Sequence, residues 1–345
     1  MLKNRHINSK EQGMSAKTNM AVIEMTAPGG PEVLSLGERP CPTPSENEVL
    51  IKVIAAGVNG PDLVQRRGHY PPPKGASDLL GLEVSGVITA TGSAVTAWRE
   101  GDQVTALTNG GGYAEYVTVL ADHVLPIPDG VSLEDAARLP ETFFTVWSNI
   151  FHQMPRNKGT RFLVHGGAGG IGSTAIQLGA AMGYEVLTTI GSQEEADWCI
   201  SLGANHTINF RNEDFVEITR SAGGADIILD IIGGDYLARN IKAARADGRL
   251  VQIAFNHGSK MEIDLMPVML KRLTFTGSTL RSRPDAFKAT IAEELRQQVW
   301  PLFADGTITT TTHTVFPLGE AAAAHQMMEA ATHRGKILLA PDHSN

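Results

Sequence analysis

A glycine-rich segment at residues 165–172, with the sequence HGGAGGIG, constrains the fold of this chain more than any other feature. The apolar run RFLV precedes it, and the run STAIQLGAAMG, rich in small and apolar residues, follows it. A strand that enters a glycine loop and leaves it as a helix opens a β-α-β unit, which belongs to a parallel sheet. The alternative is an ordinary tight turn, but so many glycines would weaken such a turn for no structural gain.

The spacing of the glycines indicates what the loop binds. Gly167, Gly169 and Gly172 form the pattern G-x-G-x-x-G between the predicted strand and helix. In a dinucleotide-binding loop the first glycine permits the tight turn, the second lets the backbone approach the pyrophosphate, and the third lets helix and strand pack closely. The N-terminus of the helix offers unpaired N–H groups to the phosphates. We therefore predict that the cofactor is bound by six consecutive residues: Gly167, Ala168, Gly169, Gly170, Ile171 and Gly172.

The rest of the chain predicts an α/β fold with a doubly wound parallel sheet and a second, mostly β unit. After residue 139, short apolar runs alternate with helix-like stretches, as in a Rossmann sheet. Residues 20–139 instead carry short β-type runs bounded by glycine and proline. The runs are clearest at 49–55, 83–90, 103–107 and 114–119 in the first part, and at 160–164, 185–190, 207–210, 225–231, 248–254 and 273–277 in the second. Two helical stretches, 285–302 and 318–331, and a strand at 336–340 follow, and we expect them to pack back onto the first unit.

Charge and composition exclude several classes of function. The formal net charge is −8, so no overall positive field draws the chain onto nucleic acid or an anionic membrane. No apolar run approaches the roughly 20 residues that span a bilayer, and the first twenty residues lack the apolar core of a secretion signal. The spacing of the two cysteines, Cys41 and Cys199, suits neither a disulfide framework nor a cysteine-based zinc site. We predict a cytoplasmic protein that binds neither nucleic acid nor membrane.

The end of the second Rossmann strand bears on the choice between NAD and NADP. The run EVLTTI ends at Gly191 and Ser192, where an acidic residue would bind the ribose 2′-hydroxyl of NAD. A small hydroxyl residue leaves room for the 2′-phosphate of NADP, so NADP(H) is favoured over NAD(H). Glu194 and Glu195 lie in the next turn. They either repel that phosphate or are solvated first-turn residues of a helix, where the helix dipole stabilises carboxylates.

Several motifs resemble, in the same order, those of a known superfamily. They are GVNGPD at residues 57–62, Arg66, Gly68, YPPP at 70–73, GLE at 81–83, GGYAEY at 111–116, the glycine loop, and INF at 208–210. From residue 20 to residue 340 the chain resembles the medium-chain dehydrogenase/reductase superfamily. It is most similar to the quinone oxidoreductase branch, which includes zeta-crystallin and the NADPH:quinone reductases.

This resemblance implies a GroES-like catalytic domain into which a Rossmann domain is inserted. We place the Rossmann dinucleotide-binding domain at residues 139–281 and the GroES-like domain at residues 20–138 plus 282–345. Residues 1–19 are expected to be a disordered extension. The resemblance also implies a homodimer in which nucleotide domains pair through edge strands such as residues 273–277.

The zinc ligands of the alcohol dehydrogenases in this superfamily are absent from the sequence. Asn59 stands at the position of a ligating cysteine, and Leu82, before Glu83, stands at the position of a ligating histidine. We therefore predict no zinc. Without a Lewis acid, alcohol oxidation is difficult because the alkoxide is not stabilised. Quinones and conjugated enones accept hydride more easily, since the negative charge is delocalised, so we expect a zinc-independent NADPH-dependent reductase of such a small molecule.

Further site residues follow from the resemblance. Asn59 and Tyr70 match polar active-site positions and are assigned to substrate or nicotinamide contact; the alternatives are a turn residue and a rim aromatic. Thr145 is placed beside the nicotinamide, with a buried helix threonine as the alternative. The remaining predicted cofactor contacts lie at or just after strand ends: Ser192, Phe210, Phe255 and Leu280.

Some features leave the chemistry open. Family members commonly carry a lysine near Glu195 and a tyrosine at Phe210, and Val64 replaces an aromatic found in some members. Asp62 and Arg66, four residues apart, are expected to form a structural ion pair on one helix face. No residue stands out as an obligatory general acid.

Two other functions compete with quinone or enone reduction. Related modules reduce the double bond of acyl thioesters, and Arg281 and Arg283 keep an enoyl-thioester reductase open, although no dedicated basic groove for a carrier protein is evident. A non-catalytic nucleotide-binding protein is the other alternative, as the lens crystallins of this family illustrate.

Overall fold

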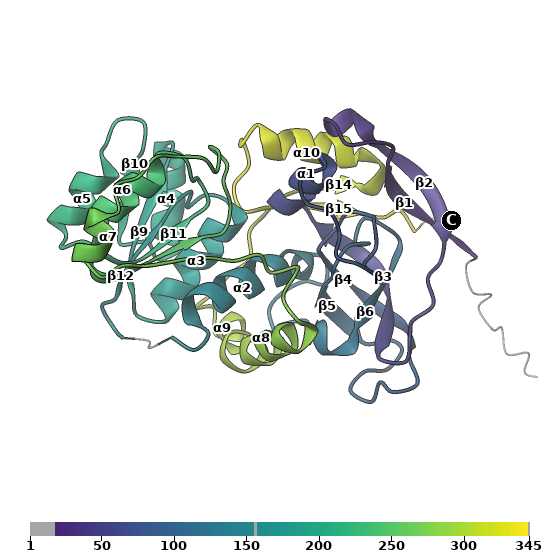
Figure 1. Ribbon diagram of the computed structural model, residues 1–345. Helices are drawn as coiled ribbons and strands as arrows, with labels where there is room; N and C mark the ends of the chain where they lie inside the picture. Colours follow the sequence, from purple (N-terminus) through teal and green to yellow (C-terminus); the bar gives the residue numbers. More distant parts are fainter. Residues whose placement is uncertain (1–17, 155–156, 344–345) are drawn as a thin grey trace, which may run out of the picture.

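The chain builds its two sheets from stretches that are interleaved in sequence. The computed structural model describes residues 18–154 and 157–343, and these form two sheet-based units side by side (Figure 1). One unit contains a six-stranded sheet, and the other contains a seven-stranded sheet together with a two-stranded one. The predicted α/β class, a Rossmann sheet with a mostly β unit, is confirmed. Most of the extension predicted at residues 1–19 lies outside the described residues, and its last residue already begins β1 (Asn19–Met25).

The six-stranded sheet has the strand order of a doubly wound nucleotide-binding fold. Its strands are parallel and run in the order β10-β9-β8-β11-β12-β13, with the glycine loop leaving β8 near the centre. Their bounds are β8 (Arg161–Val164), β9 (Glu185–Ile190), β10 (His206–Asn209), β11 (Ala225–Asp230), β12 (Ala244–Gln252) and β13 (Thr274–Gly277).

Helices cover both faces of this sheet because successive side chains of a strand point to opposite faces. In β8, Phe162 and Val164 pack into one apolar cluster and Leu163 into another. The first cluster includes residues of α3 (Gly170–Ala181) and α4 (Gln193–Ser201). The second includes residues of α5 (Phe215–Ser221), α6 (Tyr236–Ala243) and α7 (Met266–Leu270). Burial on both faces explains why these strands read as continuous apolar runs.

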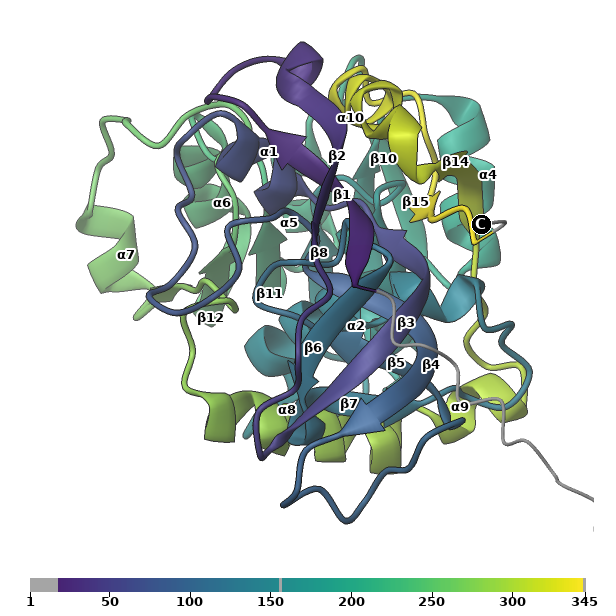
Figure 2. The ribbon, with the colours of Figure 1, turned by 90° about the vertical axis from the view of Figure 1, so that its right-hand side faces the viewer.

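The seven-stranded sheet runs β14-β15-β3-β4-β5-β7, with β6 also paired to β3. Figure 2 views this sheet from its outer side, with the helices of the other unit behind it. The members are β3 (Glu48–Gly57), β4 (Glu83–Thr91), β5 (Gln103–Leu107), β6 (Tyr116–Leu120), β7 (Val124–Pro126), β14 (Thr312–Pro317) and β15 (Lys336–Ala340). β1 pairs with β2 (Leu34–Pro40). The alternating burial of β3, with Val49, Ile51 and Val53 inside, shows one face turned to the core.

The C-terminal part differs from expectation in two respects. The helix predicted at 285–302 is two helices, α8 (Asp285–Gln298) and α9 (Pro301–Ala304), because Pro301 cannot continue the first one. α8 packs against α2 (Pro140–Val146) as well as β7, so one apolar cluster joins both units. The domain boundaries at residues 138/139 and 281/282 therefore stay a prediction.

Within the described residues, no helix is both long and apolar enough to cross a membrane.

Candidate active site

The predicted nucleotide contacts gather at one edge of the six-stranded sheet. The glycine loop follows β8, Ser192 follows β9, Phe210 follows β10, and Phe255 and Leu280 lie three residues beyond β12 and β13. Because the strands are parallel, all five sites lie at the carboxyl edge, where open α/β sheets bind their ligands. The side chains differ in exposure: Phe210 and Phe255 are about half exposed, whereas Leu280 is buried in the core.

The shape of the glycine loop fits a phosphate group, although the glycine that makes the tight turn is not the predicted one. The tight turn is made by Gly166, whose φ is +74°, and not by Gly167. A Cβ on Gly167 would lie 2.9 Å from Cys199 Sγ, and one on Gly172 would lie 2.6 Å from the Cα of Gly167. A Cβ on Gly169 would meet nothing nearer than 3.8 Å. Gly167 and Gly172 therefore allow close packing, and Gly169 leaves open space at the N-terminus of α3, which fits a pyrophosphate.

The turn after β9 is built around a helix cap. Ser192 is the N-cap of α4, and its Oγ accepts a hydrogen bond from Glu195 N (3.2 Å). Glu195 Oε2 in turn accepts one from Gly191 N (2.6 Å), the residue before the N-cap, so the Glu195 carboxylate is engaged at the start of α4. Two arginines flank this turn: Arg334 Nη1 lies 3.8 Å from Glu194 Oε2, and Arg211 Nε would lie 3.5 Å from a Cβ on Gly191.

A buried ion pair lies in the mostly β unit, beside the glycine loop. Lys336 Nζ donates to Glu83 Oε1 (2.6 Å), Asn59 Oδ1 (2.5 Å) and Val58 O (3.0 Å). Asn59 Nδ2 also donates to Glu83 Oε1 (2.8 Å). The Lys336 side chain passes the glycine loop, since a Cβ on Gly170 would lie 2.7 Å from its Cδ. Asn59 thus lies near the glycine loop, and its contact with substrate or nicotinamide stays a prediction.

A second carboxyl group faces this ion pair. The backbone N–H of Glu141, at the start of α2, donates to Glu83 Oε2 (2.8 Å). Burial, followed by the negative charge of Glu83, raises the pKa of Glu141 to about 8. Thr145 lies one helical turn further along α2, on the same face as Glu141. Each of the two is 9% exposed.

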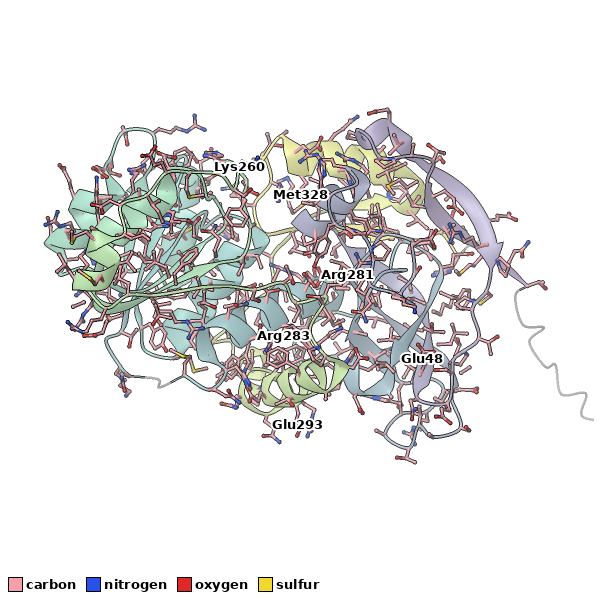
Figure 3. All side chains as sticks on the ribbon, in the orientation of Figure 1. Glu48, Lys260, Arg281, Arg283, Glu293 and Met328 are labelled. Atoms are coloured by element: carbon pink, nitrogen blue, oxygen red, sulfur yellow. The ribbon has the colours of Figure 1, made fainter. Side chains whose placement is uncertain are left out.

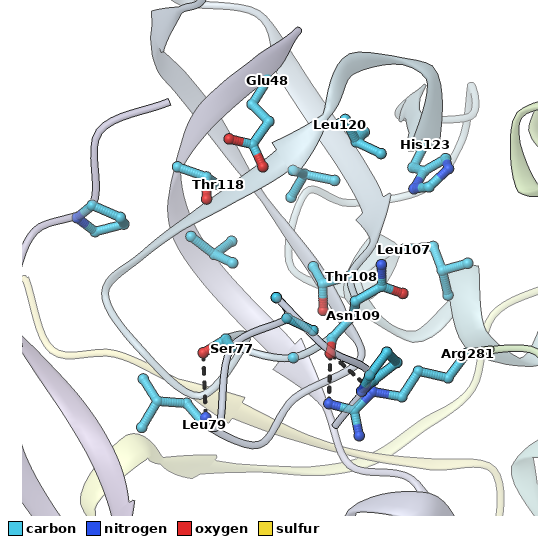
Figure 4. Close-up of a pocket in the computed structure, with 18 of the residues that line it drawn as sticks. Glu48, Ser77, Leu79, Leu107, Thr108, Asn109, Thr118, Leu120, His123 and Arg281 are labelled. Atoms are coloured by element: carbon cyan, nitrogen blue, oxygen red, sulfur yellow. Dashed lines mark hydrogen bonds between the residues drawn. The ribbon is translucent and has the colours of Figure 1, made fainter. Parts of the chain in front are cut away.

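Tyr70 lies at the rim of the site and packs on an arginine. The guanidinium carbon of Arg281 is 5.6 Å from the centre of the Tyr70 ring, and burial raises the pKa of Tyr70 to about 12. Arg281 lies between the two units (Figure 3) and donates to Gln65 Oε1 (2.6 Å) and Asn109 O. It also lines a surface hollow of about 610 Å³ on the mostly β unit (Figure 4), to which none of the predicted site residues contributes.

The expected ion pair between Asp62 and Arg66 is wrong, because each side chain has partners from distant elements. Asp62 accepts from Asn59 N (2.9 Å), Gly81 N (3.0 Å) and the Tyr113 hydroxyl (3.3 Å), and burial raises its pKa to about 6. Arg66 forms its ion pair with Glu329 and bonds His325 Nδ1 (3.1 Å). Both partners lie on α10 (Ala321–Glu329). These bonds hold the helix that begins after Asn59.

The residues around the buried ion pair do not fit zinc. Asn59 offers an amide and Leu82 an alkyl group, and the Lys336 ammonium already occupies the space between Asn59 and Glu83. The positive charge of Lys336 would repel a divalent zinc ion placed there. Zinc also needs thiolate, imidazole or carboxylate ligands, which Asn59 and Leu82 do not provide. Throughout residues 18–154 and 157–343, no group of three or more His, Cys, Asp or Glu side chains could hold a metal ion.

Sequence reasoning missed four charged residues that the fold brings to these sites. Glu141 has a local signal, its spacing of four from Thr145 on one helix. Lys336 and Arg334 come from the end of the chain, and Arg211 follows Phe210 directly. A basic residue next to a predicted phosphate contact is a signal that could have identified Arg211.

Comparisons with known proteins agree with this geometry. Family models described as "Alcohol dehydrogenase GroES-like domain" and "Zinc-binding dehydrogenase" match residues 45–129 and 202–339. Human quinone oxidoreductase is 31% identical over 332 residues, which cover 93% of this chain and 97% of the relative. The solved structure of Escherichia coli quinone oxidoreductase complexed with NADPH is 28% identical, with a TM-score of 0.83 and coverage of 93% of this chain and 100% of that one. The CurK enoyl reductase structure is also 28% identical, with a TM-score of 0.82 and coverage of 94% and 100%. The chain belongs to the quinone oxidoreductase branch of the medium-chain dehydrogenase/reductase superfamily.

Proposed function

We propose that the protein is a zinc-independent reductase that transfers hydride from NADPH to a quinone or a conjugated enone. The observation that carries this proposal is the Lys336 ammonium, which bonds Asn59 and Glu83 where the alcohol dehydrogenases of the superfamily hold zinc. A fixed ammonium with all three protons engaged supplies no open coordination position for an alkoxide. A quinone or enone needs none, since its oxyanion is delocalised and hydrogen-bond donors suffice.

The chain's own residues then have defined roles. The glycine loop and the N-terminus of α3 bind the pyrophosphate. Bound reduced nicotinamide supplies the hydride. Asn59 and Thr145 orient the ring, and Tyr70, which packs on Arg281, stacks on the acceptor or donates its hydroxyl to it. Close alignment of the two reactants provides most of the acceleration.

The proposal is tested with the metal-depleted protein and three additions. NADPH titration followed by fluorescence measures binding, a simple quinone tests turnover, and crotonyl thioester tests the main alternative. Metal-independent NADPH oxidation with the quinone supports the proposal. Turnover restored only by zinc contradicts it.

A preference for the thioester would identify an enoyl-thioester reductase, a function that the likeness to the CurK enoyl reductase favours. NADPH binding without turnover on any acceptor would indicate the non-catalytic alternative. Either result replaces quinone or enone reduction as the function.

We further propose that NADPH is bound in preference to NADH, through Arg334 and Arg211. Glu195 is engaged at the start of α4, and Glu194 has Arg334 as its neighbour. Arg334→Ala is expected to weaken NADPH binding about 10-fold, because a charge-assisted bond to the 2′-phosphate is lost, while NADH binding changes less than about twofold. Parallel fluorescence titrations measure this, with Arg296→Ala on α8 as the control. Equal losses for both cofactors would contradict a role at the 2′-phosphate.

We also propose that two chains pair through β13. It is the edge strand of the six-stranded sheet, and exposed apolar side chains surround it: Leu265, Met266, Met269, Leu270 and Phe275. An apolar groove of about 70 Å³ lies beneath them, lined in part by Leu273 and Phe275. Such a patch at the outer edge of a sheet is typical of an interface between subunits.

Replacing Leu270 and Phe275 together by glutamate is expected to convert the dimer into a monomer. Four buried like charges, two from each chain, would meet at a symmetric interface, and each costs several kcal/mol to desolvate. Sedimentation at micromolar concentration measures the change. The control is Leu36→Glu on β2, which adds a charge at another exposed apolar position. A monomeric wild-type protein, or a double variant that stays dimeric, would contradict pairing through β13.

A further inference from the structure

Two buried carboxyl groups, those of Glu83 and Glu141, are neighbours, and their hydrogen bonds are unequal. Glu83 accepts from Lys336 Nζ (2.6 Å), Asn59 Nδ2 (2.8 Å) and the backbone N–H of Glu141 (2.8 Å). The carboxyl group of Glu141 has no hydrogen-bond donor among the parts of the chain that the structure describes. All three protons of the Lys336 ammonium are already engaged.

This inequality decides which carboxyl group carries the proton. Two neighbouring carboxylates removed from water are not both ionised, because their repulsion and desolvation are unfavourable. Three donors, one of them the Lys336 ammonium, bond the Glu83 carboxylate and none in the described chain bonds that of Glu141, so Glu141 is the neutral acid. The other groups around Glu141 do not reverse this: Asp62 and Glu83 favour protonation, and Arg281 and Lys336 only partly offset burial. Enzymes provide an acid at neutral pH through such pairs, in which the surroundings make the pKa values of the two groups differ.

The helix places this acid on the same face as Thr145, the residue predicted to lie beside the nicotinamide. Glu141 and Thr145 share one face of α2 and are each 9% exposed, while Thr142, Phe143 and Phe144 between them are at most 3% exposed. The face of α2 that carries both residues is therefore its least buried one. Tyr70 is close enough for Glu141 to raise its pKa electrostatically. An acceptor held between Tyr70 and Thr145 would have the Glu141 carboxyl group within reach.

We infer that Glu141 is the catalytic acid that protonates the acceptor oxygen during reduction. This inference rests on the proposed function. The reduced nicotinamide provides the hydride with both electrons, and the acceptor gains negative charge on oxygen. The O–H bond of Glu141 breaks as a new O–H bond forms on that oxygen. Glu141 is left as a carboxylate and takes a proton from water before the next turnover, so one hydride and one proton are consumed per acceptor.

Glu141→Gln tests the inference, because glutamine keeps the size and polarity of the side chain but cannot transfer a proton. The acceptor kcat/KM is expected to fall about 100-fold, the usual magnitude for general acid catalysis, with the Kd for NADPH unchanged within about twofold. In the wild-type protein kcat/KM should fall as the pH rises past about 8, since only the protonated form is active. This alkaline decrease should be absent from Glu141→Gln. Glu293→Gln, an exposed position on α8, is the control.

Activity within about threefold of wild type in Glu141→Gln, or an unchanged alkaline decrease, would overturn the inference. A parallel loss of NADPH affinity would also overturn it, because Glu141 would then act structurally. Infrared titration separates this inference from the proposed function. A carboxylic acid C=O band that is lost at alkaline pH and absent from Glu141→Gln supports the acid even if no acceptor is reduced. Turnover on a quinone without such a band leaves the proposed function standing and removes Glu141 as the acid.

Discussion

Lys336→Ala is expected to lower the free energy of unfolding by about 4 kcal/mol, the typical cost of removing one partner of a buried ion pair. The Glu83 carboxylate is completely buried and would lose its only ionic partner in the described chain, while Asn59 Oδ1 and Val58 O would lose a donor. Urea unfolding monitored by fluorescence measures the change. Lys158→Ala, at an exposed position, is the control and should cost less than about 0.5 kcal/mol.

A paired variant tests whether the charge itself is responsible. Lys336→Met combined with Glu83→Gln removes both charges and retains most of the side-chain volume, so it should recover much of the lost stability. If the double variant is no more stable than Lys336→Ala, the loss comes from packing and not from the unpaired carboxylate.

Gly169→Ala is expected to abolish most cofactor binding without destabilising the fold. The added methyl group would meet no protein atom nearer than 3.8 Å and would project into the space assigned to the pyrophosphate. NADPH affinity should fall about 100-fold, equivalent to about 2.7 kcal/mol, with the urea midpoint unchanged. Gly172→Ala should instead lower both the NADPH affinity and the urea midpoint, because its Cβ would press on the backbone of Gly166 and Gly167.

Gly319→Ala is the control for these two variants, since a Cβ there would meet nothing within 4 Å. Fluorescence titration and urea unfolding on all three proteins give the comparison. Full NADPH affinity in Gly169→Ala would show that the open side of the loop does not face the cofactor.

Local patterns in the sequence were sufficient for most of the fold. Strands buried on both faces and the glycine loop predicted the parallel sheet, because a β-α-β unit is encoded within about 30 residues. β14 was missed, since its alternating threonines leave it only partly buried and give no apolar pattern. The break after α8 was missed although Pro301 marks it.

The site was less predictable because its contacts join distant residues. Asn59 and Lys336 are separated by 277 positions, and no local pattern relates them. The pairing expected for Asp62 and Arg66 failed for the same reason: a spacing of four allows an ion pair, but Glu329 on a remote helix competes for the arginine. Glu141 differs, because its placement beside Thr145 is local to one helix and is visible in the sequence.

The junction between β15 and the glycine loop has a mechanical consequence. Gly335 N donates to Ala168 O (2.9 Å), and Gly169 forms a parallel bridge with Gly335. The next residue, Lys336, forms the buried ion pair with Glu83. The glycine loop and the backbone that carries Lys336 are thus fastened together. A displacement of the loop relative to the mostly β unit would therefore also pull on the lysine that bonds Asn59 and Glu83.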